Sequence, residues 1–269
     1  MFPNYSNLYS REQSLGPQTN PRCTTYSNLE KAIRTAILIP ARDESKTLPR
    51  LFTELERVTD TIDCILVVDN ASRDITSEVA KNLGALVVYE SRPGYGHACM
   101  AGIDRLRREF PPEVLIFLDA DDFAAPKQLN SLLDPIREGK ADLVVGERRT
   151  CGEGGVRWHA RLGNQFITAA LRIKFGSHVR DMGPFRAIRW SMLEALELDD
   201  PTYGWYVQMQ VRALRSGYRV HGIEVDFERR TAGRSKVSGN LIASVRAGWV
   251  MLRTLVVESL RAKTNLSKR

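Results

Sequence analysis

The chain is poor in cysteine and has no long apolar run. Four of its 269 residues are cysteine, at Cys23, Cys64, Cys99 and Cys151. They are too scattered for a C-x-x-C metal clip and too few for a disulfide framework, which favours a reducing, cytoplasmic environment. The longest apolar stretches, Ala36 to Pro40 and Gly248 to Val257, fall short of the roughly 18–20 apolar residues that a membrane-spanning helix needs. We therefore expect no transmembrane span.

The first thirty residues also lack the pattern of a structured or targeting segment. Met1 to Glu30 is rich in Asn, Ser, Tyr, Gln and Pro, and it lacks the basic-then-apolar order of a secretory signal. We expect residues 1–33 to form a flexible arm.

A moderate excess of positive charge marks the composition. The chain has 39 Lys and Arg against 32 Asp and Glu, a formal net charge of +7. Its 43% hydrophobic and 26% charged residues are typical of a globular domain and exclude a disordered chain. A basic surface suits nucleic acid, an anionic membrane or a phosphate-bearing substrate. Because the basic residues alternate with acids and lack interleaved aromatic side chains, nucleic acid is disfavoured.

From Thr35 onward, short apolar β-branched runs alternate with stretches of helical period. The predicted strands are Ala36–Ile39, Cys64–Val68, Ala85–Tyr89, Val114–Leu118 and Ala141–Val145. The predicted helices between them end at about Val58, Leu83, Arg108 and Arg137. This alternation predicts an α/β fold of Rossmann-like type, with a mainly parallel central sheet flanked by helices. After Gly146 the pattern changes to a Gly-rich loop, a helix over about His159–Lys174 and a mixed section.

Carboxylates follow the fourth predicted strand directly, in the order Asp119, Ala120, Asp121 and Asp122. Ligands of open α/β sheets bind beyond the carboxyl ends of the strands. Carboxylates at positions i and i+2 can share one hard divalent cation, and Mg²⁺ or Mn²⁺ held in this way neutralises a diphosphate leaving group. The alternative is a solvated acidic turn, because short motifs often occur by chance.

The loops after the first three predicted strands also carry polar residues. Asp43 and Glu44 after the first strand, and Asp69 after the second, can accept hydrogen bonds from a base imide or ribose hydroxyls. Asp74 is better explained as a helix cap. The third loop offers a cation, Arg92, two glycines and a helix N-terminus, a combination suited to phosphate.

These residues resemble the GT-A-fold glycosyltransferases of family 2, and within it the polyprenyl-phosphate sugar transferases such as the dolichol-phosphate mannose synthases. The resemblance covers roughly Thr35 to Gly239. It rests on five motifs in the family's order, which are Pro40-Ala-Arg-Asp-Glu44, Val68-Asp-Asn-Ala-Ser-Arg-Asp74, Asp119-Ala-Asp121, Asp181-Met-Gly-Pro-Phe-Arg186 and Arg230-Thr-Ala-Gly-Arg-Ser-Lys236. Together they are far more specific than any one of them.

The resemblance implies a site for a nucleotide sugar. The candidate donor-binding residues are Pro40, Ala41, Asp43, Glu44, Asp69, Asn70, Arg92, Gly96, Asp119, Ala120 and Asp121, with Asp119 and Asp121 as metal ligands. The candidate phosphate- or acceptor-binding residues are Arg186, Arg230, Arg234, Ser235 and Lys236, with Trp205 as a ring that could stack on a sugar. Core packing is the alternative for Trp205.

The implied reaction is inverting transfer of a sugar from a UDP- or GDP-sugar, with Mg²⁺ or Mn²⁺, to a phosphate or hydroxyl acceptor such as a polyprenyl phosphate. A phosphate monoester is already ionised at neutral pH and needs orientation but no strong base. A hydroxyl needs a base, for which Asp181 is the candidate. The alternative for Asp181 is a salt bridge to Arg186 or Arg189.

Several positions depart from the family pattern. Asn70 and Ala71 replace an Asp and a Gly, Gln208 replaces an expected Glu, and Phe123 occupies a place where relatives can offer a polar, metal-proximal side chain. We also expect Gly183 and Pro184 to alter the acceptor surface. These departures keep two alternatives open, a nucleotidyltransferase and a catalytically silent nucleotide-binding scaffold of the same fold.

The resemblance and the charge pattern divide the chain into three parts. Residues 34–239 are expected to form the GT-A catalytic domain, with 34–146 as the nucleotide-sugar half and 147–239 as the acceptor half. Residues 240–269 are expected to form an amphipathic helix, Leu241 to Leu260, and a basic tail. Such a helix packs on its own domain or lies on a membrane surface. We therefore expect a cytoplasmic protein, with peripheral contact at the inner membrane face as the second option.

Overall fold

The structure, a computed structural model, describes residues 34–58, 62–149, 158–227 and 241–260. Its strands are β1 (Thr35–Ala41), β2 (Cys64–Asn70), β3 (Leu86–Glu90), β4 (Val114–Phe117), β5 (Leu143–Arg148), β6 (Arg186–Arg189) and β7 (Val220–Val225). Its helices are α1 (Leu48–Glu56), α2 (Thr76–Asn82), α3 (Tyr95–Glu109), the short 3₁₀ helix η4 (Ala125–Gln128), α4 (Leu129–Arg137), α5 (Trp158–Phe175), α6 (Trp190–Ala195), α7 (Trp205–Arg215) and α8 (Leu241–Leu260).

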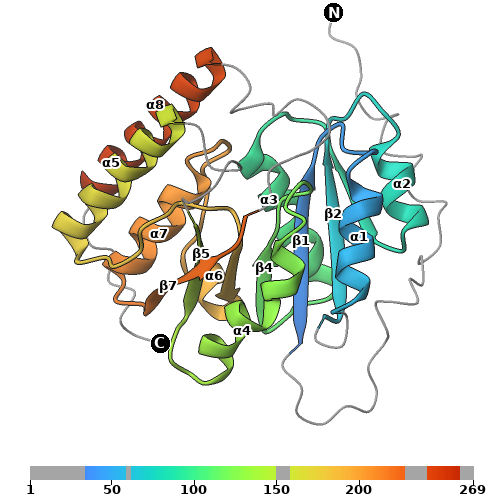
Figure 1. The fold of residues 1–269 in the computed structure, drawn as a ribbon, viewed down its shortest axis with the longest axis horizontal. Helices are drawn as coiled ribbons and strands as arrows, with labels where there is room; N and C mark the ends of the chain where they lie inside the picture. Colours follow the sequence, from blue (N-terminus) through green and yellow to red (C-terminus); the bar gives the residue numbers. More distant parts are fainter. Residues whose placement is uncertain (1–33, 59–61, 150–157, 228–240, 261–269) are drawn as a thin grey trace, which may run out of the picture.

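The strands form one mainly parallel sheet in the order β3-β2-β1-β4-β6-β5-β7. All neighbours pair in parallel except β6, which runs antiparallel to both β4 and β5. The predicted α/β fold with a mainly parallel sheet flanked by helices is therefore confirmed (Figure 1). The first five predicted strands all exist, with ends shifted by up to three residues, whereas β6 and β7 lie in the section that the sequence left unassigned.

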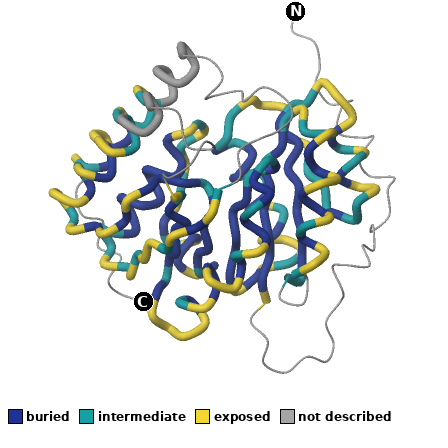
Figure 2. Tube along the Cα trace, in the orientation of Figure 1, coloured by how far each residue is buried: buried dark blue, intermediate teal, exposed yellow. Residues whose placement is uncertain are grey.

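Helices cover both faces of the sheet and bury two apolar clusters. Side chains alternate along each strand, so that Ala36 and Leu38 of β1 face α3 and α7, while Ile37 and Ile39 face α1 and α4. The central strands are buried along almost their whole length, and exposed residues lie on the outer helices and the connecting loops (Figure 2). Such near-continuous apolar strands are typical of a parallel sheet covered on both sides.

The sheet topology brings the acidic loops together. Strands β2, β1 and β4 are parallel neighbours, with Ala41 opposite Asp69 and Leu38 opposite Phe117. Their carboxyl ends therefore meet at one edge of the sheet, where the loops that carry Asp43, Asp69 and Asp119 begin. On the other side of β4 the sheet continues with β6 and β5.

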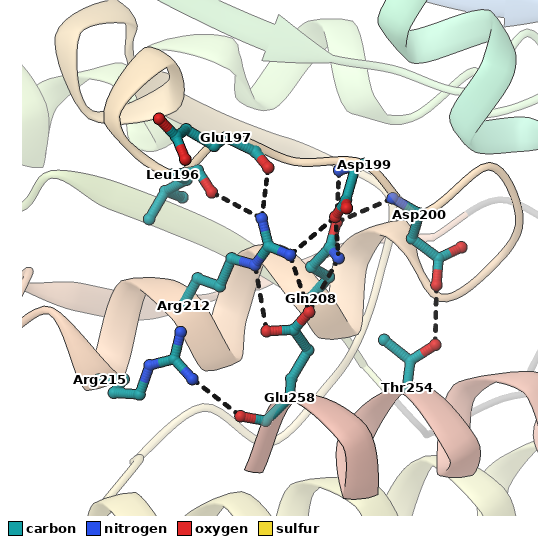
Figure 3. A network of polar contacts seen from close by, with 9 residues as sticks. All are labelled: Leu196, Glu197, Asp199, Asp200, Gln208, Arg212, Arg215, Thr254 and Glu258. Carbon is teal, nitrogen blue, oxygen red and sulfur yellow. Dashed lines mark hydrogen bonds and ion pairs between the residues drawn. The ribbon is translucent and has the colours of Figure 1, made fainter. Parts of the chain in front are cut away.

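Helix α8 packs on its own domain, beside α5 and α7 (Figure 1). Glu258 is 1% exposed and accepts hydrogen bonds from Nε and Nη2 of Arg212 on α7, at 3.1 and 2.9 Å. Thr254 donates to Asp200 at 2.8 Å, so the helix also holds the loop before α7 (Figure 3). This arrangement matches the packing alternative predicted for the C-terminal helix. Within the described ranges, no helix is long and apolar enough to cross a membrane.

The Arg212–Glu258 pair gives a test of this docking. Glu258→Ala would leave the buried guanidinium of Arg212 short of its main counter-charge, so we expect the free energy of unfolding to fall by about 3–5 kcal/mol. Arg253→Ala, an exposed change on the same helix, should stay within about 0.5 kcal/mol of wild type. Urea unfolding of both variants measures the difference. Equal stability of the two variants would contradict this docking.

Candidate active site

The acidic cluster Asp119, Asp121 and Asp122 lies in the turn between β4 and η4. Burial, followed by the charge of Asp121, raises the pKa of Asp119 to about 7. Burial likewise raises the pKa of Asp122 to about 6, although its Oδ1 accepts a hydrogen bond from the backbone of Ala125 at 3.2 Å. The cluster therefore holds more negative charge than its surroundings compensate. Such a set of carboxylate oxygens fits a hard divalent cation.

Asp119 is also held by a tyrosine that the sequence did not single out. The hydroxyl of Tyr95, at the start of α3, donates to Oδ1 of Asp119 at 3.1 Å. It is also hydrogen-bonded to the hydroxyl of Tyr206 on α7. Burial raises the pKa of both phenols well above their ordinary value, so both hydroxyls keep their protons at neutral pH.

The predicted base- and ribose-binding acids brace the first two loops against each other. Oδ1 of Asp43 accepts from the backbone N–H of Arg73 at 2.6 Å, and the backbone N–H of Asp43 donates to Ser72 at 2.9 Å. Asp69 accepts from the backbone of Ser72 at 2.9 Å and from the hydroxyl of Ser77. The structure thus brings the two loops together, and nucleotide contact by Asp43 and Asp69 stays a prediction.

The remaining residues of these loops have structural roles as well. Oε2 of Glu44 accepts from the hydroxyl of Thr47 at 2.6 Å. Asp74 accepts from the backbone N–H of Thr76 at 3.0 Å and from the hydroxyl of Ser45 at 2.6 Å, just before α2 begins. The N-cap of α2 is Ile75, without a side-chain cap hydrogen bond, so the prediction of Asp74 as the cap is wrong. Its carboxylate instead forms a turn ahead of the helix. Pro40 and Ala41 are the last two residues of β1.

Asn70, which replaces a family acid, is needed as an amide. Its Nδ2 donates to the backbone carbonyl of Arg92 at 2.7 Å, and its Oδ1 accepts from the backbone N–H of Gly94 at 2.8 Å. An ionised Asp could not make the first bond, because a carboxylate only accepts. Ala71, in place of the family's Gly, has φ of +56°, a left-handed conformation that costs a non-glycine residue about 1 kcal/mol.

The glycines of the third loop make room for protein backbone. A side chain at Gly96 would collide with the carbonyl of Asp200, and one at Gly94 with the carbonyl of Pro201. The carbonyl of Pro201 also accepts from the backbone N–H of His97 in the first turn of α3. This close backbone packing gives Gly96 a structural reason, and its phosphate contact stays a prediction. Arg92 is exposed and paired with Glu90 at 2.9 Å.

Asp181, the predicted base, is held in a salt bridge. Nε and Nη2 of Arg148 donate to its two oxygens at 2.7 and 2.9 Å, and the backbone N–H of Arg148 donates at 3.0 Å. Burial would raise the pKa of Asp181, but the hydrogen bonds and charge of Arg148 outweigh it and keep that pKa below its ordinary value. The salt-bridge alternative therefore describes this residue, with Arg148 as partner instead of Arg186 or Arg189. A carboxylate held in this way is a poor base.

Arg186 and Trp205 are buried, which corrects their predicted contact with substrate. Arg186 is 0% exposed, and its Nε donates to the carbonyl of Gly183 at 2.7 Å while its guanidinium lies 4.2 Å from the ring centre of Tyr206. Burial lowers its pKa to about 10. Trp205 is 1% exposed, so no ring face is free to stack on a sugar. Its neighbour Tyr203, 41% exposed, is the accessible aromatic of this loop.

Gln208, in place of an expected Glu, joins three elements. Its Nε2 donates to Asp199 at 2.7 Å and to Glu258 at 3.0 Å, and its Oε1 accepts from the backbone N–H groups of Asp199 and Asp200 (Figure 3). All of its polar capacity is used. A Glu here would face two carboxylates, so the amide has a structural reason.

Phe123 lies beside the acidic cluster, whereas the predicted phosphate loop is outside the described part of the chain. Phe123 is 3% exposed and lies under the guanidinium of Arg50, 4.1 Å from the ring centre, so it contributes packing beside the acidic cluster. The predicted phosphate loop, with Arg230, Arg234, Ser235 and Lys236, lies outside the described residues.

Sequence reasoning missed Tyr95, Tyr206 and Arg148. Arg148 could have been found, because it lies at the carboxyl end of β5, where parallel strands present their functional residues. Tyr95 could have drawn attention as a large side chain between Gly94 and Gly96. Tyr206 has no signal in the sequence, because its partners Tyr95 and Arg186 are distant in the chain.

The chain belongs to glycosyltransferase family 2. Residues 36–197, more than half of the chain, match the family described as Glycosyl transferase family 2. This finding excludes a nucleotidyltransferase as the family assignment.

The relatives of the chain include two proteins named as transferases that act on lipid phosphates. The chain is 36% identical over 211 residues to an uncharacterized glycosyltransferase of Mycobacterium tuberculosis, covering 78% of this chain and 93% of that protein. It is 33% identical to the undecaprenyl-phosphate mannosyltransferase of Micrococcus luteus, covering 78% and 90%, and 32% identical to the polyprenol monophosphomannose synthase of Mycolicibacterium smegmatis, covering 78% and 83%.

Solved structures support the fold. A glucosyl-3-phosphoglycerate synthase from Mycobacterium tuberculosis, crystallised with Mn²⁺, UDP and glucosyl-3-phosphoglycerate, superposes with a TM-score of 0.71 at 20% identity, over 87% of this chain and 82% of that one. The same enzyme was crystallised with Mg²⁺ and UDP. The likeness confirms the predicted GT-A architecture.

The role of Gln208 can be tested by Gln208→Glu. The new carboxylate would face Asp199 and Glu258, so we expect the free energy of unfolding to fall by about 1–3 kcal/mol at pH 8. Repulsion raises the folded-state pKa of the new Glu, so the loss should shrink near pH 5, where the group is protonated. Gln165→Glu, an exposed change on α5, is the control, and unfolding at both pH values is the measurement. A stable Gln208→Glu variant at pH 8 would show that the amide is dispensable.

Proposed function

We propose that this protein is a metal-dependent, inverting glycosyltransferase that moves a sugar from a UDP- or GDP-sugar to a phosphate acceptor, with polyprenyl phosphate as the preferred candidate. The observation that carries the proposal is the opposition of charge at the sheet edge. The acidic cluster follows β4 and Arg148 ends β5, and these two strands run in the same direction, so both lie at the carboxyl ends of the sheet strands. The charge of Arg148 lowers the pKa of Asp119 and Asp122, against the larger effect of burial. A donor diphosphate and an anionic acceptor both need such a pairing of metal site and fixed cation.

Asp119 and Asp121 would hold the divalent cation. When bound, Mg²⁺ or Mn²⁺ supplies positive charge to the diphosphate leaving group. The described residues contain no group of three or more His, Cys, Asp and Glu side chains arranged for a metal, so water and phosphate oxygens would complete the coordination. The Mn²⁺, Mg²⁺ and UDP complexes of the similar synthase support this assignment.

A phosphate acceptor is favoured over a hydroxyl acceptor because the carboxylate of Asp181 is held in a salt bridge to Arg148. A hydroxyl acceptor needs a base with a pKa near neutrality, whereas the pKa of Asp181 is lowered. A phosphate needs only orientation, and Arg148, fixed by two hydrogen bonds to Asp181, is a rigid cation for that purpose. The names of the two lipid-phosphate relatives agree with this choice.

A lipid acceptor would also require contact with a membrane surface. Helices α5 and α8 present exposed apolar side chains, namely Phe166, Ile173, Trp249, Val256, Val257 and Leu260. Exposed cations lie on the same helices at Arg172, Lys174 and Arg253. Apolar side chains flanked by cations suit an anionic bilayer. We therefore include peripheral membrane contact, at the cytoplasmic face, in the proposal.

The departures from the family pattern do not favour a silent scaffold. Asn70 and Gln208 are fully engaged in holding loops, as described above, and neither faces the acidic cluster as a lost catalytic group.

Donor hydrolysis and thermal stabilisation across UDP-, GDP- and dTDP-sugars, each with Mg²⁺, Mn²⁺ or chelator, test the donor and metal. A ligand that binds only the folded state raises the melting temperature, so weak donors register. We expect a UDP- or GDP-sugar to act only with metal, and Asp121→Ala to reduce that activity by about 10²- to 10³-fold. Asp134→Ala, an exposed change on α4, should have no effect. Full metal-dependent activity of Asp121→Ala would contradict the metal role.

The acceptor assignment predicts a mild phenotype for Asp181→Asn. If Asp181 only fixes Arg148, kcat should fall by no more than about tenfold, whereas loss of a general base costs about 10²- to 10⁴-fold. Asp142→Asn removes a carboxylate that is also bound to an arginine, Arg219, at the other end of β5, and serves as control. Steady-state rates with whichever acceptor the wild-type protein uses, polyprenyl phosphate or an alcohol, decide between the two roles. A loss near 10⁴-fold in Asp181→Asn alone would restore Asp181 as the base.

A further inference from the structure

Tyr95 is placed to control the orientation of Asp119. It is the first residue of α3, and its hydroxyl donates to Oδ1 of Asp119 at 3.1 Å. The two residues belong to different strand-end loops, one after β3 and one after β4. A hydrogen bond from a phenol to a carboxylate is charge-assisted and stronger than one between neutral groups.

The ring of Tyr206 fixes the position of Tyr95. The two ring centres are 5.2 Å apart and the two hydroxyls are hydrogen-bonded. Tyr206 itself is 6% exposed. Its ring packs edge-on against Phe117, with 6.2 Å between the ring centres, and the guanidinium of Arg186 stacks over it at 4.2 Å from the ring centre. These contacts restrain Tyr206, and its contact with Tyr95 restrains the Tyr95 side chain in turn.

The direction of the hydrogen bonds follows from the chemistry of the groups. A carboxylate that binds a metal is ionised and only accepts, so in that state the proton of Tyr95 points to Asp119. The oxygen of Tyr95 is then the acceptor for the proton of Tyr206. Both phenols thus direct their protons toward the carboxylate, and each bond polarises the next.

We propose that Tyr95 is a positioning residue that holds the carboxylate of Asp119 in the orientation needed to bind the metal, with Tyr206 as its support. The proposal rests on the function proposed above and deepens it. Groups that hydrogen-bond a metal ligand fix its geometry, and their loss typically costs about 10- to 100-fold in metal affinity or activity. Removing the Tyr95 hydroxyl should therefore weaken the metal response and leave the fold intact.

The test is Tyr95→Phe, which keeps the ring and removes the hydroxyl. Calorimetric titration of UDP and of GDP, at a series of Mn²⁺ concentrations and with chelator, separates metal-dependent from metal-free binding. We expect the Mn²⁺ concentration for half-maximal binding to rise by about 10- to 100-fold, with metal-free binding unchanged. Tyr206→Phe should shift it in the same direction by a smaller factor. Tyr218→Phe, a half-buried tyrosine beyond the other end of α7, is the matched control.

Each result bears on a different claim. If Asp119→Asn removes the Mn²⁺ response while Tyr95→Phe leaves it unchanged, the positioning role is wrong and the proposed function stands. If wild-type binding of both nucleotides is indifferent to Mn²⁺, the proposed function and the positioning role both fall. A general loss of stability would lower metal-free binding as well, and that result would show a merely structural role. If Tyr95→Phe does not fold, an unchanged Mn²⁺ response in Tyr206→Phe overturns the proposal.

Discussion

The concentration of negative charge at the end of β4 is the constraint on which the site depends. Asp119, Asp121 and Asp122 lie within four residues, and burial together with mutual repulsion raises the pKa of Asp119 and Asp122. Two neighbouring groups compensate part of this charge. Tyr95 donates a hydrogen bond to Asp119, and the positive charge of Arg148 lowers the pKa of Asp119. In the proposed function a divalent cation compensates the rest.

The loops around this cluster are held by two amides at positions where the family motif led us to expect acids. Asn70 ties the loop after β2 to the loop after β3, and Gln208 ties α7 to α8 through Glu258. Both use a donor group that a carboxylate lacks. The same network places Asp200 and Pro201 against the glycines at the start of α3. Residues that look like losses of function in the sequence therefore support the architecture of the site.

Local pattern was sufficient to predict the first half of the fold, because β1 to β5 and their helices each carry strong periodicity. It was insufficient for β6, whose antiparallel place between β4 and β5 depends on long-range pairing. The acidic cluster was predicted from its position after a strand. The burial of Arg186 and Trp205 was not predicted from the sequence. An arginine or a tryptophan can be exposed or buried, and which one holds depends on partners distant in the chain, such as Tyr206 for Arg186. The salt-bridge role of Asp181 could be assigned only once the structure showed Arg148 beside it.

The most direct test of the account is transfer of labelled sugar from the active donor to polyprenyl phosphate and, in parallel, to the corresponding polyprenol, with Mn²⁺ and with chelator. The two acceptors share a lipid and differ only in the phosphate. We expect metal-dependent product with polyprenyl phosphate and none with polyprenol, because in the proposed function Arg148 orients the anionic acceptor and Asp181, in its salt bridge with Arg148, does not act as a base. Equal transfer to the alcohol would contradict the account and require a general base at this site.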